Sequence, residues 1–177
     1  MIFVTIHTMN DAIKTQNPDV YQLDKLMEET RSLAAKYRAG TGQTLPVTHD
    51  LACYDAIRLL DLNRPVEVEA GIDAIKTSDS EPELLKYNIK GRVQFSNVRT
   101  KQQRIGQLNL DADWNLCLLV IMEDDYFPTL ILAASRDSID EVLKDKPANK
   151  RGAMTVAQFR IISELVWEKE ASAEAQA

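Results

Sequence analysis

The chain has 177 residues, of which 45% are hydrophobic and 27% are charged, and its formal net charge is −6. This composition is typical of a globular domain and excludes the disordered and fibrous classes. A chain of this length can fold around one core without metal or disulfide crosslinks. The negative net charge gives no support to a protein that binds polyanions over its whole surface.

Two cysteines, Cys53 and Cys117, lie far apart, and each is surrounded by apolar residues. We expect them to be buried thiols of a reducing compartment. Together with His7 and His49 they do not form the clustered ligand pattern of a zinc site. The first residues, MIFVTIHTM, lack the features of a secretory signal, and no run of 18 apolar residues occurs. We therefore expect a cytoplasmic protein that has no contact with a membrane.

Two amphipathic helices are predicted in the first third of the chain. Asn17-Pro18 is a helix-start signal, and apolar residues then recur at helical spacing over about 19–39. The same spacing returns over 48–62, after two glycines that end the first helix. Pro65 closes the helical part.

From Val66 onward the pattern changes to short segments typical of strands. We predict strands over 66–69, 72–75 and 87–95, the last with strict alternation of apolar and polar residues. The polar segment 76–82, KTSDSEP, is typical of a hairpin connection. The second and third of these strands are therefore predicted to be antiparallel neighbours.

The second half of the chain alternates between predicted strands and short helices. Segment 114–122, WNLCLLVIM, is apolar on both faces, which favours a buried strand over a short helix, and 130–133 is a further strand. Two capping boxes predict helix starts; these boxes are Ser138 with Glu141, before a helix over 139–143, and Thr155 with Gln158, before a last helix reaching Trp167.

These elements predict an α/β fold in which a central mixed sheet of about five strands is flanked by helices. The predicted organisation is an N-terminal extension over 1–17, a single domain over 18–168 and a disordered tail over 169–177. The tail is low in complexity, which is typical of a frayed terminus.

Polar residues gather on one face of the predicted strand 87–95. Because side chains alternate along a strand, Asn88, Lys90 and Arg92 share that face. Asp73 lies in an otherwise apolar segment one strand earlier, and a buried carboxylate needs a partner. A carboxylate facing an oxygen-bearing side chain and a lysine on the neighbouring strand is a layout suited to metal-assisted phosphodiester hydrolysis.

The two segments G-I-D-A-I and K-Y-N-I-K-G-R resemble the Asp and the (D/E/Q)-x-K of the PD-(D/E)XK nuclease superfamily, and in particular bacterial restriction-endonuclease-like domains. Segment 41–62, TGQTLPVTHDLACYDAIRLLDL, is similar to the helix that precedes the core there, and the resemblance spans roughly 20–167. It implies a restriction-endonuclease-like fold, DNA as the substrate and the possibility of a homodimer.

The same resemblance implies roles for individual residues. Asp73 and Asn88 would ligate Mg²⁺ or Mn²⁺, and Lys90 would be the catalytic lysine. An acidic residue near the start of the preceding helix assists the metal in that family, which points to Asp50, with Asp55 as the alternative. Asn88 stands where a carboxylate or glutamine is usual, so the metal site has one negative charge fewer.

A basic stretch accompanies these residues. Segment 84–110 contains no Asp or Glu although the whole chain is acidic. Apart from Lys90, which has the catalytic role above, we expect its basic residues to bind nucleic-acid phosphates; they are Lys86, Arg92, Arg99, Lys101 and Arg104. The alternative is a solvated edge strand whose charges prevent aggregation.

Three functional hypotheses follow. The first is a Mg²⁺-dependent phosphodiesterase of the DNA endonuclease kind. The second is a non-catalytic nucleic-acid- or partner-binding module with a nuclease-like fold, and the third is a structural or assembly protein. His49, beside a helix start, is interpreted as a surface or capping residue.

Overall fold

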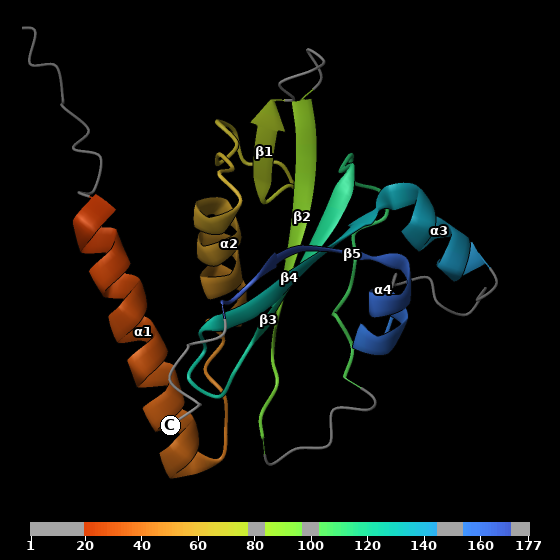
Figure 1. The fold of residues 1–177 in the computed structure, drawn as a ribbon. Helices are drawn as coiled ribbons and strands as arrows, with labels where there is room; N and C mark the ends of the chain where they lie inside the picture. Colours follow the sequence, from red (N-terminus) through yellow and green to blue (C-terminus); the bar gives the residue numbers. More distant parts are fainter. Residues whose placement is uncertain (1–19, 78–83, 97–102, 145–153, 171–177) are drawn as a thin grey trace, which may run out of the picture.

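The structure is a computed structural model that describes residues 20–77, 84–96, 103–144 and 154–170. Within these ranges the chain forms four α-helices and one five-stranded mixed sheet (Figure 1). The helices are α1 (Val20–Thr41), α2 (Thr48–Leu59), α3 (Arg136–Lys144) and α4 (Val156–Ile162), and the strands are β1 (Ala74–Thr77), β2 (Leu84–Val93), β3 (Leu116–Met122), β4 (Pro128–Ser135) and β5 (Glu164–Glu168). The prediction of a mixed sheet flanked by helices is confirmed.

Several predicted features lie outside the described residues. They are the N-terminal extension over 1–17 with the helix-start signal Asn17-Pro18, most of the hairpin connection 76–82, and most of the tail.

The strands follow the chain in the order β1-β2-β3-β4-β5. β1 and β2 are antiparallel, as predicted, with Ala74 opposite Tyr87, and β2 and β3 are parallel. The last two pairs, β3 with β4 and β4 with β5, are antiparallel. A parallel pair needs a crossover connection, and the segment between β2 and β3 provides it.

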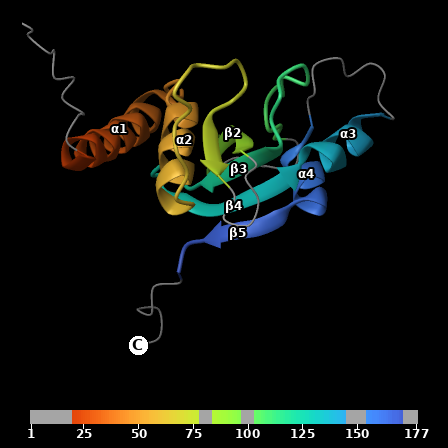
Figure 2. The ribbon, with the colours of Figure 1, turned by 90° about the horizontal axis from the view of Figure 1, so that it is seen from above.

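Both faces of the sheet are covered, and each carries its own apolar cluster. On one face, Ile89 of β2 and Val120 of β3 pack with α2 and with Ala34 of α1. On the other face, Leu119 of β3 packs with α3, α4 and the crossover connection. Figure 2 shows α2 and the α3–α4 pair on opposite sides of the strands. The burial pattern of β2 agrees with the predicted alternation, since Ile89 and Val93 are buried while Lys90 and Arg92 are half-buried.

Helix α2 lies directly against β2, at Gly91. A Cβ atom at this position would lie 2.7 Å from the carbonyl oxygen of Thr48 and 2.8 Å from the Cβ of Ala52. Only glycine permits so close an approach of helix and strand. The contact fixes the first turn of α2 above the sheet and thereby positions His49.

Helix α1 is attached to this layer by a buried ion pair. The Arg31 guanidinium donates to Asp55 Oδ1 of α2 at 2.5 Å, and it also donates to the carbonyl oxygen of Tyr126 in the β3–β4 turn. Its other side rests on the ring of Phe127, 4.8 Å from the ring centroid. Asp55, the alternative metal-assisting residue, therefore contacts Arg31 in the core.

The predicted strand 66–69 is wrong. Val66 and Val68 are 97% and 100% exposed, and the segment is irregular in the described structure. The Val-Glu-Val-Glu alternation is typical of a strand, but a strand forms only where a neighbouring strand accepts its hydrogen bonds.

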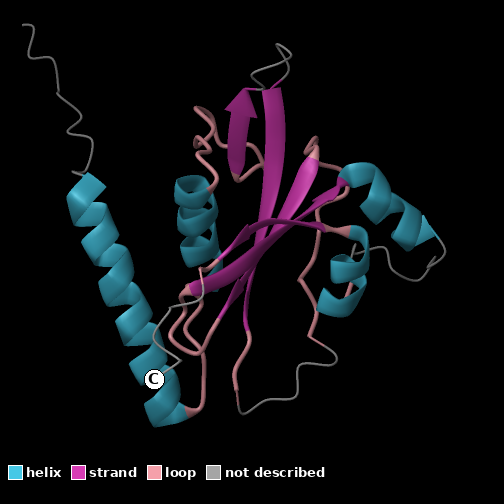
Figure 3. Cartoon of the chain, viewed as in Figure 1, coloured by secondary structure: helices cyan, strands magenta, loops and turns pink. Residues whose placement is uncertain are grey.

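The predicted continuation of the last helix to Trp167 is also wrong. α4 ends at Ile162, Ser163 adopts an extended conformation, and β5 follows and pairs with β4 (Figure 3). Ile161, in the last turn of α4, is 83% exposed. The count of five strands is right because this missed strand replaces the one wrongly predicted at 66–69.

Helix starts were predicted with mixed success. The capping box of Thr155 and Gln158 is present at the start of α4. α3, however, begins at Arg136 rather than at 139, because the Ser135 hydroxyl accepts the Ser138 backbone N–H at 3.2 Å. Ser135, and not Ser138, supplies the cap of this helix.

Candidate functional site

Asp73 lies immediately before β1 and takes part in the pairing of β1 with β2. Its backbone N–H donates to the carbonyl oxygen of Tyr87 at 2.8 Å. Its Oδ2 atom accepts the Ile89 backbone N–H at 2.6 Å and the Asn88 side-chain amide at 3.3 Å. The carboxylate thus acts as a main-chain acceptor at the end of the ladder, which fixes its orientation.

The second carboxylate oxygen of Asp73 faces helix α2. Oδ1 lies 3.4 Å from Nε2 of His49, in the first turn of α2. The same Nε2 atom lies 3.6 Å from Sγ of Cys53, one helical turn later. His49, Cys53 and Asp73 are therefore a connected group of side chains.

These contacts shift the pKa values of both His49 and Asp73. Hydrogen bonds to Asp73 and then to Cys53 raise the pKa of His49 to about 10. Burial alone would raise the pKa of Asp73, but the hydrogen bonds from His49 and Ile89 and the nearby charge of Lys90 hold it below its usual value. The pair is an imidazolium and a carboxylate at neutral pH.

Asp73 opens into a polar hollow of about 480 Å³, which we call the Asp73–Lys90 hollow. Its wall consists of residues from α2, the segment before β1, β2 and the crossover connection; they are His49, Gly71, Asp73, Asn88, Lys90 and residues 107–111. The structure thus places Asp73, Asn88 and Lys90 in one hollow.

Asp50, the expected metal-assisting acid, does not line the Asp73–Lys90 hollow. It lies exposed in the first turn of α2 and lines a second hollow of about 550 Å³, with Cys53 and Arg64. His49 and Asp73 line both hollows and form the wall between them.

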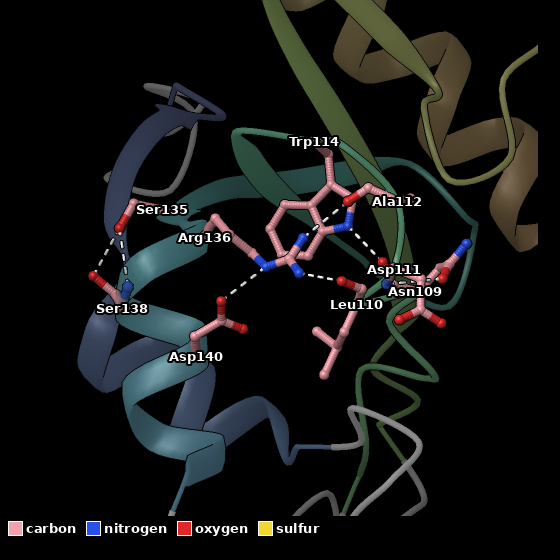
Figure 4. Close-up of polar contacts among 9 residues, drawn as sticks. All are labelled: Asn109, Leu110, Asp111, Ala112, Trp114, Ser135, Arg136, Ser138 and Asp140. Atoms are coloured by element: carbon pink, nitrogen blue, oxygen red, sulfur yellow. Dashed lines mark hydrogen bonds and ion pairs between the residues drawn. The ribbon is translucent and has the colours of Figure 1, made fainter.

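The crossover wall of the Asp73–Lys90 hollow is held by Arg136 of α3 (Figure 4). Its guanidinium donates to the carbonyl oxygens of Leu110 and Ala112, pairs with Asp140 at 3.0 Å, and lies 4.4 Å from the ring centroid of Trp114. Main-chain acceptors held by a guanidinium define a loop conformation closely.

Two further contacts fix this wall. The indole N–H of Trp114 donates to the carbonyl oxygen of Asn109 at 2.8 Å. A Cβ at Gly71 would lie 2.8 Å from the Cβ of Ala112, so the wall packs tightly against the residues before Asp73. The hollow is therefore bounded by well-packed segments.

Two of the basic residues expected to bind nucleic acid are engaged in contacts within the chain. Lys86 forms ion pairs with Glu69 at 3.0 Å and with Asp113 at 3.3 Å, which balance its charge. Arg92 donates to the carbonyl oxygens of Gly91 and Arg104, and burial lowers its pKa. Arg104 is exposed, while Arg99 and Lys101 lie outside the described residues.

The expected Mg²⁺ ligands are a poor match for the donors present. The amide nitrogen of Asn88 donates to the Gly71 carbonyl at 2.8 Å and to Asp73, and its Oδ1 atom is buried without a hydrogen-bond partner among the described residues. Ligation by Asn88 would require the amide to turn over and break both bonds. Mg²⁺ needs several oxygen ligands, and these two side chains offer few free oxygen atoms. Binding of Mg²⁺ by Asp73 and Asn88 therefore stays a prediction, and the geometry does not favour it.

The role of His49 was missed by the sequence reasoning. Its contact with Asp73 depends on how α2 crosses β2, which is not a local property. The signal that points to it is the spacing of His49 and Cys53, since residues four apart share one helical face. The expectation against a zinc site weighed His49 and Cys53 but not their four-residue spacing.

Comparison with known proteins adds no family. The chain matches no model of a known protein family, and no curated protein is similar to it. None of the described helices is long and apolar enough to span a bilayer. Any functional assignment therefore rests on the geometry of the two hollows.

Proposed function

We propose that the protein is a nuclease-like phosphodiesterase that works at the Asp73–Lys90 hollow. The observation that carries this proposal is the shared hollow itself, which brings a fixed carboxylate and a lysine together from neighbouring segments. The same combination, on the same two segments, underlies the resemblance to the PD-(D/E)XK superfamily.

Each side chain has a physical role in this proposal. The ammonium group of Lys90 neutralises charge that develops on a phosphate oxygen as the bond to phosphorus forms. In this class of enzyme a divalent cation supplies the attacking hydroxide, and Asp73 is the carboxylate that would anchor it. Gln107 and Asn109, on the crossover connection that lines the hollow, offer neutral hydrogen bonds to the sugar–phosphate backbone.

A second candidate function is a nuclease-like module that binds nucleic acid without cleaving it. It is favoured by the Asn88 amide, which presents its nitrogen to Asp73 where a second carboxylate is expected. In that case Lys90 still attracts a phosphate, and binding weakens as salt rises.

The two candidates separate in one experiment. Supercoiled DNA, single-stranded DNA and RNA are incubated with the full chain in Mg²⁺, Mn²⁺, Co²⁺ or Zn²⁺, and cleavage is followed on gels while binding is followed by fluorescence anisotropy. We expect Lys90→Ala to lower the cleavage rate by about 10²-fold. Lys36→Ala, an exposed lysine of α1, is the matched control and should leave the rate unchanged.

The outcomes are distinct. Binding without cleavage in every cation rejects the phosphodiesterase and leaves the binding module. Neither binding nor cleavage at low salt rejects both, and equal rates for Lys90→Ala and the parent chain reject the role of Lys90.

A further inference from the structure

Three potential metal ligands converge at the wall between the two hollows. The donor atoms of His49, Cys53 and Asp73 all lie within 4.8 Å of one another. Two of them come from successive turns of α2, and the third precedes β1 and is held by the strand ladder. The group therefore draws on α2, which packs on β2 at Gly91, and on the residue before β1, which β2 holds through Ile89.

The two donor spacings that involve His49 match those around a bound zinc ion. With zinc bonds of about 2.0 Å to nitrogen and oxygen and about 2.3 Å to sulfur, tetrahedral ligands lie about 3.3 Å (N to O) and about 3.5 Å (N to S) apart. Here Nε2 of His49 lies 3.4 Å from Oδ1 of Asp73 and 3.6 Å from Sγ of Cys53. An ion can enter with small side-chain adjustments, as the His49 imidazolium and the Cys53 thiol release their protons to water.

The carboxylate of Asp73 is asymmetric in a way that selects the metal. Oδ2 is occupied by the Ile89 N–H and the Asn88 amide, so Oδ1 is the oxygen that remains for a cation. A cation at Oδ1 meets the imidazole of His49 and the thiol of Cys53 on its other side. Nitrogen and sulfur donors favour zinc and related transition metals over Mg²⁺.

We propose that His49, Cys53 and Asp73 bind one zinc-class divalent cation at this wall. Three protein ligands leave the fourth tetrahedral position for water or a substrate atom, the arrangement of catalytic rather than structural zinc. The Ile89 N–H and the Asn88 amide orient the ligating carboxylate from behind, as outer-shell partners do in zinc sites. The two hollows on either side give the ion a path of entry.

This inference goes beyond the proposed phosphodiesterase function and does not depend on it. Binding of the metal can be measured whether or not the chain cleaves any nucleic acid. A metal that binds without cleavage would reject the phosphodiesterase and keep the site, whereas cleavage in Mg²⁺ by a chain that binds no zinc would do the reverse.

The test uses the full, tag-free chain after treatment with a chelator. Co²⁺ is titrated as the spectroscopic probe, because a thiolate ligand gives a charge-transfer band in the near ultraviolet and tetrahedral geometry gives intense visible bands. Zn²⁺ binding is measured by calorimetry, with Mg²⁺ as the competitor. We expect one ion per chain, both sets of bands, and no displacement by Mg²⁺.

Matched variants make the assignment specific. Cys53→Ser should abolish the charge-transfer band, and His49→Ala and Asp73→Asn should each weaken Zn²⁺ affinity by at least about 10-fold. Cys117→Ser changes the other, buried thiol, and Asp50→Asn changes the acid next to His49; both should bind as the parent chain does. Circular dichroism verifies that each variant is folded.

Three results would overturn the proposal. They are the absence of a charge-transfer band in the parent chain, a band that survives in Cys53→Ser but is lost in Cys117→Ser, and an Asp50→Asn variant that loses as much affinity as Asp73→Asn.

Discussion

Asp55 belongs to α2, and Asp73 contacts α2 through His49. The surroundings of these two carboxylates nevertheless differ. Asp55 is fully buried, and its charge is paired with Arg31 at 2.5 Å. The Asp73 side chain is 17% exposed, is held by a backbone N–H, and faces an imidazole. Both have lost most of their water, but only Asp73 borders open hollows.

The difference shows what marks a carboxylate as a candidate site. Burial next to a positive charge describes both residues and therefore distinguishes neither. The guanidinium of Arg31 is itself buried and ties α1 to α2, which makes Asp55 part of the framework. The partner of Asp73 is exposed, so an incoming ion or substrate can reach the pair.

The largest expected effect comes from breaking the framework pair. Arg31→Met leaves Asp55 as a buried charge without a partner, and we expect the free energy of unfolding to fall by about 3–5 kcal/mol. Urea denaturation followed by circular dichroism measures the change. The double variant Arg31→Met with Asp55→Leu should recover most of the loss; a double variant less stable than Arg31→Met would contradict this account.

The next effect concerns the contact that positions α2 above Asp73. Gly91→Ala places a Cβ against Thr48 and Ala52, and we expect overpacking to lower the free energy of unfolding by about 1–3 kcal/mol. Gly40→Ala in α1 is the matched control, because a Cβ there meets nothing within 4 Å. It should be neutral or stabilising by up to about 1 kcal/mol. Similar losses in both variants would show that the helix–strand contact is not the cause.

A smaller effect is expected when a second carboxylate is placed beside Asp73 at position 88. Asn88→Asp removes two hydrogen bonds and sets a second carboxylate against Asp73, so we expect a loss of about 1–2 kcal/mol in metal-free buffer. A divalent cation such as Mn²⁺ should reverse this loss by offsetting the repulsion. Thermal melts with and without Mn²⁺ measure it, and Asn115→Asp is a control away from the pair. If Mn²⁺ stabilises both variants equally, the paired carboxylates do not form a cation site.

The smallest perturbation compares the two thiols without altering stability. Burial raises the pKa of the Cys117 thiol to about 12, so at pH 8 it has almost no thiolate, whereas Cys53 is partly exposed beside His49. We expect iodoacetamide to label Cys53 in the native protein and Cys117 only after unfolding in urea. Peptide mass spectrometry checks the sites, and Zn²⁺ should protect Cys53 alone. Labelling of Cys117 in the native state would show that its strand opens to solvent.

The parts of the fold that follow local patterns were predictable. The 3.6-residue spacing gives α1 and α2, and the alternation along β2 places Asn88 and Lys90 on one face, because successive side chains of a strand point to opposite faces. The segment at 66–69 has the same alternation without a partner, and β5 was hidden by apolar residues that also fit a helix after the Thr155 cap. Both errors concern pairing between distant segments, which no sequence window contains.

The contacts of the candidate site likewise separate into those that local sequence patterns predict and those that depend on distant segments. The hairpin and the alternation sufficed to predict that Asp73, Asn88 and Lys90 come together. The contact of His49 with Asp73 was not predictable, because it requires the distance between α2 and β2 that Gly91 sets. The Arg136 contacts were missed for the same reason, since they join a helix after β4 to a connection before β3.

The tether from Arg136 to the connection over 109–112 gives the Asp73–Lys90 hollow a remote determinant of its shape. Arg136 and its ion-pair partner Asp140 sit on α3, which contributes no side chain to the lining. Substitutions in α3 can therefore widen or narrow the hollow, and so change the size of the molecule that it binds, without altering any lining residue. Substitutions that accumulate in α3 during evolution have the same effect, so related chains with identical lining residues can differ in the size of the ligand that they bind.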